Sequence, residues 1–326
     1  MPRPISLVVT VLLGSALALG AQSTQAPVTT LPLPPDTRFP EGIAYSPARD
    51  TFFTANAETG AVFEINRKGD SARVVVPEGV LAPSGTMTFP VALGMKVDAA
   101  GRLWIAGGRT GRMSVVDVES GTVLKQVVAP SGAGSLINDV ALVGGAAYFT
   151  DTRTPTLWRL AVTGNRIGEL EAWTTFADTP IEYDGGNNLN GVTVTPDGAA
   201  LVVVQMDKGL LFLIDLASKG IRKIETTGID LSGGDGLVMA GDLLYVVRQP
   251  AGEIVTLQLQ PDPPLAKLVN RFRDPALRWP ATALLLEKSL IVVNSQFNTR
   301  VTKAAISPFT FADVPLSRLA GPVTPR

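Results

Sequence analysis

The chain of 326 residues contains no cysteine and no histidine. It can therefore form no disulfide, no thiolate or imidazole metal site, no cysteine nucleophile and no Ser-His-Asp triad. Any catalysis must come from carboxylates, amides, lysine, arginine, tyrosine or hydroxyl groups, or from a hard metal ion held by oxygen atoms.

A strong net charge is also absent, because 28 basic and 29 acidic side chains leave a formal charge of −1. The chain has no long basic run, which argues against a dedicated nucleic-acid binder. Hydrophobic residues make up 45% of the chain, enough for the core of one large domain. The 32 glycines and 25 prolines are spread along it, as in a fold with many turns.

The N-terminus has the features of a secretory signal peptide. Arg3 gives a short positive start, an apolar run follows over residues 5–19, and small residues come next at Gly20 and Ala21. The run is short for a membrane-spanning helix, although a membrane anchor is the alternative. No cysteine follows it, which excludes a bacterial lipoprotein. We predict a signal peptide over 1–21 with cleavage within 19–26, a Pro/Thr-rich spacer over 22–38, and a secreted or periplasmic protein.

The remaining chain repeats one plan in six units, which start at residues 41, 93, 138, 190, 235 and 281. Each unit begins with a short apolar strand and continues through a polar or Gly-containing turn. It then enters a second strand, such as TFFTA, LWIAG, AYFTD or LVVVQ. Most units reach a third strand, such as GAVFEI or GLLFLIDL.

Short strands with closely spaced turns indicate an all-β protein. A period of about 48 residues with three or four strands per unit indicates propeller blades. We therefore predict a single six-bladed β-propeller over residues 39–326, with about four strands per blade. A β-sandwich and an open solenoid are the alternatives. The sixth unit has no evident fourth strand, and the segment VTTLPL over residues 28–33 is a candidate to close the ring.

In a propeller the first strands line the central channel, so the residues that open the six units converge on one face of the disc. Four of these residues carry a side-chain oxygen: Glu41, Asn138, Asn190 and Asp235. The other two are Leu93 and Ala281. Two buried carboxylates without a counter-ion are unfavourable, and a divalent cation would neutralise them. Four protein oxygens plus water fit calcium better than magnesium, which requires a stricter octahedron.

Each of these residues taken singly has a simpler interpretation. Asn-Gly and Asp-Gly pairs are among the commonest hairpin turns, and two of the units open with such a pair. The metal hypothesis depends on four oxygen-bearing residues in one matching register.

The strand starts FPEGIAY, SLINDVAL, NLNGVTVTPDG and GGDGLVM resemble those of calcium-dependent six-bladed propeller hydrolases. These are the senescence-marker-protein/gluconolactonase family and its relatives diisopropylfluorophosphatase, paraoxonase and the strictosidine synthase-like proteins. The resemblance covers about residues 39–297 and implies that Glu41, Asn138, Asn190 and Asp235 hold one catalytic calcium. The Asn138-Asp139 pair also resembles paraoxonase, in which the neighbouring Asp helps to hold a second, structural calcium. We leave that second site open.

The resemblance implies an exported hydrolase of a small-molecule lactone, ester or phosphoester, with calcium polarising the substrate oxygen. Asp235 would be the nucleophile or the general base, and the residues do not separate these roles. Paraoxonase-type mechanisms use histidines near the metal, which this chain lacks. The alternative is a non-catalytic propeller that binds a ligand or a protein, resembling royal-jelly-type or NHL-type scaffolds. We expect a monomer with a small-molecule substrate, no nucleic-acid partner and no stable membrane insertion after signal cleavage.

Further candidates come from strand geometry. The second strand of a blade returns to the face where the first one starts, so its end lies one layer outside the ring. The residues at these ends are Asn56, Asp151, Gln205, Arg248 and Asn294. Arg248 is a candidate for binding an anionic substrate group, with a structural arginine as the alternative. Lys96, within the first strand of the second unit, is a candidate for the substrate pocket in the channel.

Overall fold

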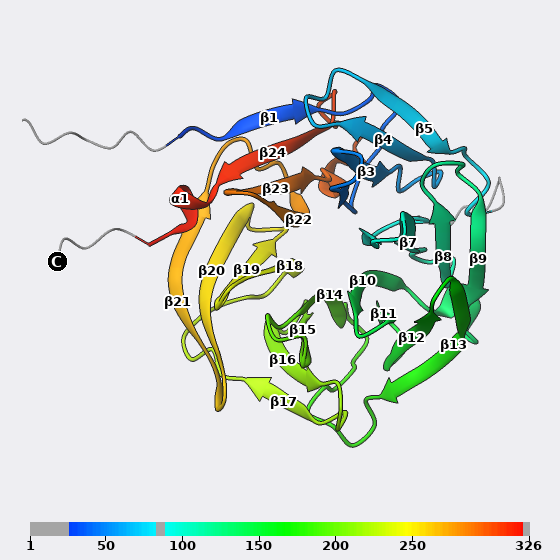
Figure 1. The fold of residues 1–326 in the computed structure, drawn as a ribbon. Coiled ribbons are helices and arrows are strands. Elements are labelled where there is room, and N and C mark those ends of the chain that lie inside the picture. Colours follow the sequence, from blue (N-terminus) through cyan, green and yellow to red (C-terminus); the bar gives the residue numbers. More distant parts are fainter. Residues whose placement is uncertain (1–25, 83–88, 322–326) are drawn as a thin grey trace, which may run out of the picture.

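A computed structural model describes residues 26–82 and 89–321, which form a six-bladed β-propeller with four strands in each blade (Figure 1). The predicted fold class and number of blades are confirmed. The predicted signal peptide, residues 1–21, lies outside the described residues. Within the described ranges, no helix has both the length and the apolar character needed to cross a membrane.

The first three blades follow the chain in order, each as a four-stranded sheet. Blade one contains β2 (Ala44–Ser46), β3 (Thr51–Ala55), β4 (Val62–Asn66) and β5 (Ala72–Val76). Blade two contains β6 (Met95–Val97), β7 (Arg102–Ala106), β8 (Arg112–Asp117) and β9 (Val123–Val128). Blade three contains β10 (Ile137–Val143), β11 (Ala146–Asp151), β12 (Thr156–Thr163) and β13 (Arg166–Thr175).

The last three blades complete the ring. Blade four contains β14 (Leu189–Val194), β15 (Ala200–Gln205), β16 (Leu210–Asp215) and β17 (Ile221–Ile224). Blade five contains β18 (Gly234–Ala240), β19 (Leu243–Arg248), β20 (Glu253–Pro261) and β21 (Pro264–Arg273). Blade six contains β22 (Pro280–Leu286), β23 (Ser289–Asn294), β24 (Thr310–Pro315) and β1 (Thr29–Pro32). Three short helices are η1 (Gly132–Gly134), η2 (Phe297–Thr299) and α1 (Leu316–Leu319).

The N-terminal strand closes blade six, as the segment VTTLPL predicts. β1 pairs antiparallel with β24, with Thr30 opposite Ala312, and Figure 1 shows the two strands side by side where the ring closes. The spacer predicted over residues 22–38 is therefore partly a propeller strand, which corrects that boundary. Most side chains of β1 are exposed, so the strand lacks the apolar alternation by which a sequence reveals a strand.

The hydrophobic core lies between the blades. Among the described residues, six clusters of buried apolar side chains each join two neighbouring blades. At the closing seam, for example, Phe52 of blade one packs edge to face on Phe311 of blade six, with ring centroids 5.8 Å apart. The first strands contribute to this core and also lie nearest the central channel, as Figure 1 shows for β10, β14, β18 and β22.

Candidate metal centre

Four first strands share one irregularity where they enter the channel. In β10, Asn138 and Asp139 together face the single residue Thr150 of β11. The same register shift occurs in β14, β18 and β22, where the two-residue stretches are Asn190-Gly191, Asp235-Gly236 and Ala281-Thr282. Such bulges redirect side chains and are frequent beside active sites. The Asn-Gly and Asp-Gly pairs are therefore strand bulges, and the hairpin-turn interpretation is wrong for them.

Close contacts join the residues that open neighbouring blades, which we call the ring residues. The amide of Gly94 donates to the carbonyl oxygen of Asn138 over 2.9 Å. The hydroxyl of Thr150 donates to the carbonyl oxygen of Asn190 over 2.6 Å. A Cβ atom at Gly191 would lie 2.1 Å from the carbonyl oxygen of Asp235, so glycine permits the close approach of blades four and five. The ring residues thus follow one another around the channel.

Gly191→Ala is expected to destabilise the protein by about 1–3 kcal/mol, because the added methyl group would press on the backbone of Asp235. The matched control is Gly185→Ala, where an added methyl group meets nothing within 4 Å. Urea denaturation of both variants measures the difference in the free energy of unfolding. Equal midpoints for the two variants would contradict the close packing of these blades.

The four oxygen-bearing ring residues line one pocket of about 220 Å³. Their exposed fractions are only 4% for Glu41, 6% for Asn138, 5% for Asn190 and 3% for Asp235. An apolar wall and several polar residues complete the pocket: Phe89, Pro90, Leu93, Leu136, Phe297, Arg109, Asn187, Met206 and Gln249. The structure therefore brings together all four residues that the sequence singled out, in one small pocket that has both polar and apolar walls.

Three of these four residues have a buried side-chain oxygen without a hydrogen-bond partner. The atoms are Glu41 Oε2, Asn138 Oδ1 and Asn190 Oδ1, out of five such oxygens in the described part of the chain. The amide nitrogens are occupied, since Asn138 Nδ2 donates to Thr152 Oγ1 over 3.0 Å and Asn190 Nδ2 contacts Met206 Sδ at 3.3 Å. Native proteins rarely leave buried oxygens unpaired, so these three oxygens are available to a cation or to another electropositive group that enters the pocket.

The two carboxyl groups repel each other in this pocket. Burial raises the pKa of Glu41 well above its usual value, and the charges of Asp235 and Asp139 raise it further, while Lys96 opposes them. Burial and the charge of Asp139 also raise the pKa of Asp235, and a hydrogen bond from Asn190 opposes this rise. A cation bound between the two carboxylates would reverse both effects.

Asp139 has a structural task. Its Oδ1 accepts a hydrogen bond from the amide of Val140 over 2.8 Å, and its Oδ2 accepts one from the amide of Val192 in blade four over 3.0 Å. Asp139 thus ties blades three and four together, and the second calcium stays an expectation from the resemblance. No three Asp or Glu side chains of the described residues gather at a common metal position. The candidate ligand set is instead two carboxylates and two amides, which is a donor set that fits calcium.

Neither a protein-family model nor a curated protein sequence matches the chain. Three solved structures share its architecture over most of their length. The allergen Mala s 1 of Malassezia sympodialis is 15% identical with a TM-score of 0.65, over 89% of this chain and 96% of that chain. A calcium-binding protein, regucalcin, from Agrobacterium tumefaciens is 16% identical with a TM-score of 0.63, over 89% and 95% of the two chains. A gluconolactonase from Xanthomonas campestris is 17% identical with a TM-score of 0.57, over 88% and 89%.

The chain has the fold of the regucalcin and gluconolactonase propellers. This confirms at the level of fold the resemblance that the strand-start motifs indicate. Such low identity carries no activity from those proteins to this one, because one fold hosts many functions. The chemistry must be argued from the residues in the pocket.

The residues at the ends of the second strands bind the segments that lead into the ring residues. In blades three to six, these residues pair with the residue that precedes the ring residue. Each also bonds to the loop before it. Asp151 Oδ1 accepts from the amide of Leu136 over 3.0 Å, and Asn294 Oδ1 accepts from the amide of Arg278 over 2.8 Å. Gln205 Nε2 donates to Asn188 Oδ1 over 3.1 Å. These side chains therefore position the ring and do not line its pocket.

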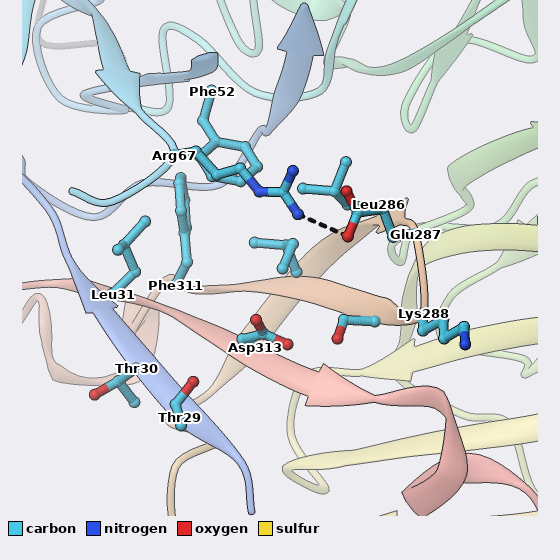
Figure 2. Close-up of a pocket in the computed structure, with 12 residues that line it drawn as sticks. Thr29, Thr30, Leu31, Phe52, Arg67, Leu286, Glu287, Lys288, Phe311 and Asp313 are labelled. Atoms are coloured by element: carbon cyan, nitrogen blue, oxygen red, sulfur yellow. Dashed lines mark ion pairs between the residues drawn. The ribbon is translucent and has the colours of Figure 1, made fainter. Parts of the chain in front are cut away.

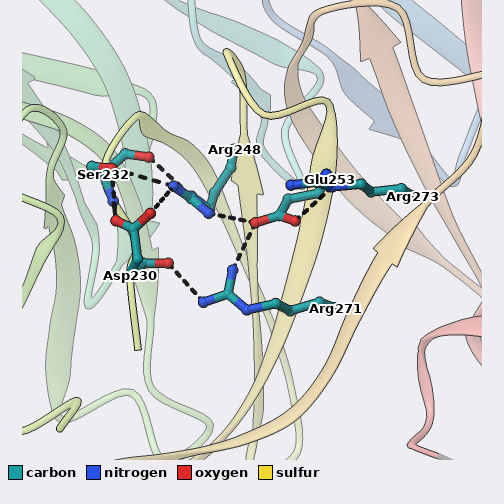
Figure 3. Close-up of polar contacts among 6 residues, drawn as sticks. All are labelled: Asp230, Ser232, Arg248, Glu253, Arg271 and Arg273. Atoms are coloured by element: carbon teal, nitrogen blue, oxygen red, sulfur yellow. Dashed lines mark hydrogen bonds and ion pairs between the residues drawn. The ribbon is translucent and has the colours of Figure 1, made fainter. Parts of the chain in front are cut away.

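Arg248 is the corresponding residue of blade five. Its sequence position made it a candidate for binding an anionic substrate group, but it does not line the pocket. Its Nε donates to the carbonyl oxygen of Ser232 over 2.9 Å, and its Nη2 pairs with Asp230 over 2.7 Å. Its Nη1 pairs with the buried carboxylate of Glu253, which two further arginines also bind: Arg271 and Arg273 (Figure 3). Such a network occupies the guanidinium fully, so the structural alternative holds for Arg248.

Lys96 lines the channel at its other end. It contributes to a separate pocket of about 270 Å³ with Tyr45 and Thr193. Its charge reaches Glu41, whose pKa it lowers. Lys96 therefore tempers the negative charge of the ring from the opposite side, and it is not among the residues that line the pocket of the four oxygens.

A larger pocket, of about 480 Å³, lies between blades six and one at the end of the strands opposite the ring (Figure 2). Its charged residues include Arg67 and Glu287, which form an ion pair of 2.8 Å across it. The rest of its lining is mainly threonine and apolar side chains, such as Phe52 and Phe311. Because no ring residue reaches it and its arginine is paired, size alone does not make it the site of chemistry.

Proposed function

We propose that the protein is an exported, calcium-dependent hydrolase of a small-molecule lactone, ester or phosphoester. The observation that carries the proposal is the set of unpartnered buried oxygens of Glu41, Asn138 and Asn190 in the pocket that also holds Asp235. Two carboxylates and two amide oxygens would hold one calcium ion, with water or substrate completing its coordination. The fold shared with a gluconolactonase and a calcium-binding regucalcin supports this assignment.

A bound calcium ion would act as a Lewis acid on a carbonyl or phosphoryl oxygen. The chain's own residues supply the rest of the site. The side chains of Phe89, Leu93 and Phe297 give one apolar wall that limits water around the substrate. Asp235 supplies the carboxylate, either as the nucleophile or as the base that takes a proton from water. Histidine, the usual base, is absent from the chain.

Calcium is expected to raise the melting temperature of the wild-type protein, and a chelator is expected to lower it. A ligand at 100 times its dissociation constant adds about 2.7 kcal/mol to the free energy of unfolding. For a chain of this size that corresponds to roughly 4 °C. Differential scanning fluorimetry with calcium, magnesium or EDTA measures the shift. A melting temperature that none of the three changes would count against the metal site.

A further inference from the structure

Two arginines from neighbouring blades lie close enough to interact electrostatically, and one of them lines the pocket; we call this side of the pocket its rim. Arg109 and Arg153 each follow the end of a second strand, two residues beyond Gly107 in blade two and two residues beyond Asp151 in blade three. They thus occupy equivalent positions in two consecutive blades. Arg109 lines the pocket of the four oxygens, and its side chain is partly buried, whereas Arg153 is exposed.

The backbone around Arg109 is held in place on both sides. Gly108 and Ile137 exchange two hydrogen bonds, of 2.9 and 3.0 Å, and Ile137 directly precedes the ring residue Asn138. The amide of Arg109 itself donates to the carbonyl oxygen of Pro90 over 2.9 Å. The backbone that carries the Arg109 side chain is therefore fixed beside the ring.

Neither arginine has a side-chain partner among the residues that the structure describes. Their guanidinium groups form no hydrogen bond and no ion pair with any residue that the structure describes. Burial lowers the pKa of Arg109, and the neighbouring charge of Arg153 lowers it further. The equivalent positions of blades one and four carry acidic residues, and both have partners. Glu58 pairs with Arg300 over 3.0 Å, and Asp207 accepts a hydrogen bond from the amide of Asn187 over 2.7 Å. Two like charges at one mouth are unfavourable unless an anion joins them.

The wall next to Arg109 is apolar. Phe89 and Phe297 pack edge to face with ring centroids 5.1 Å apart, and Leu93 and Leu136 lie in the same pocket. A ligand that satisfies the whole site would place an apolar portion against this wall and an oxyanion at the rim. The pocket volume of about 220 Å³ restricts such a ligand to a small molecule.

We propose that Arg109, supported by Arg153, binds an anionic group of the substrate. The substrate class is then a small amphipathic molecule that carries a carboxylate or another oxyanion beside an apolar portion. The reacting bond lies toward the ring and the anion toward the rim. The assignment of a reacting bond rests on the proposed hydrolase function, whereas anion binding by Arg109 does not.

The test uses benzenesulfonate and its neutral counterpart benzenesulfonamide as probes, titrated calorimetrically into the full chain with calcium present. Wild-type protein is expected to bind benzenesulfonate about 10–100-fold more tightly, as for a hydrogen bond to a charged group. Arg109→Gln should remove this preference, and Arg153→Gln should reduce it. Arg166→Gln, which changes an exposed arginine on the outer strand β13, should leave it unchanged.

The outcomes separate this inference from the proposed function. Equal binding of the two probes by the wild type, absence of benzenesulfonate binding, or a preference that survives in Arg109→Gln would each overturn the anion site. The stabilisation by calcium should persist in Arg109→Gln, because this arginine is not a candidate ligand. A preference for the anion without any calcium effect would leave the anion site standing and reject the metal centre.

Discussion

Asp235→Asn is expected to remove hydrolytic activity while the propeller stays folded. The amide keeps the size and one oxygen of the side chain but can neither attack a carbonyl nor accept a proton. Loss of a general base lowers kcat by about 10²–10⁴-fold, whereas loss of a nucleophile that acts as part of a unit lowers it by up to about 10⁶-fold. Steady-state hydrolysis of a panel of lactones and aryl esters measures the effect.

The matched control is Asp184→Asn, since Asp184 is an exposed carboxylate that does not line the pocket and that accepts a hydrogen bond from the amide of Gly186 over 3.0 Å. It should keep full activity. A wild-type protein that hydrolyses nothing on the panel would favour the non-catalytic ligand-binding propeller. An active Asp235→Asn variant would move the chemistry to another residue of the pocket.

The fold could be predicted from the sequence because each blade repeats the same local pattern of residues. Apolar strands and Gly-containing turns recur at a nearly constant period, and this alone predicts six blades. The closing strand β1 carries little such signal. Its residues Thr29–Pro32 are mostly exposed and pair with the edge of β24. This pairing joins segments that are far apart in the sequence. Pairing of this kind depends on the closed ring and not on local pattern.

The four oxygen-bearing ring residues could also be predicted, since equivalent positions in the repeat lie at equivalent positions around the channel. The reason for the Asn-Gly and Asp-Gly pairs could not be predicted. They look like turns, yet a bulge places the first residue of each pair toward the channel and packs Gly191 against Asp235 in the next blade. A bulge is defined by pairing with a second strand, so local residue preferences did not reveal it.

The outer residues were harder to assign, because strand geometry gives the layer but not the direction of a long side chain. Arg248 lies at the predicted strand end, where Asp230 and Glu253 capture its guanidinium. The comparison of second-strand ends did not reveal Arg109, because the residue at that position in blade two is Gly107. The pattern GGRTG after LWIA was the available signal, since it places a lone arginine in a tight turn beside the ring.

The ring places two mutually repelling carboxyl groups in a set of ligands that fits calcium. Glu41 and Asp235 are both nearly fully buried, and the charge of Asp235 contributes to the raised pKa of Glu41. Ionised carboxylates buried without a partner destabilise a fold. Such destabilisation at a site usually indicates that function, and not stability, has determined its residues.

Glu41→Gln is therefore expected to have opposite effects on stability and on calcium binding. Removing one of the two ring carboxylates should weaken calcium binding by about 100-fold, since ligand charge sets affinity. Without metal, the variant should melt at least about 2 °C above the wild type, because a buried charge is gone. Fluorimetric melting and calcium titration measure the two effects.

The stability of the metal-free protein should depend on pH through the carboxyl group of Glu41. Because the pKa of Glu41 is raised in the folded protein, its native-state advantage is complete below the unfolded-state pKa of about 4.3 and is lost as pH rises through the folded value. Metal-free wild type should thus lose more stability than Glu41→Gln between mildly acidic and neutral pH. Glu182→Gln, at an exposed carboxylate, should follow the wild type. If metal-free Glu41→Gln melts below the wild type at neutral pH, Glu41 has a stabilising partner in the free protein and the charge conflict is absent.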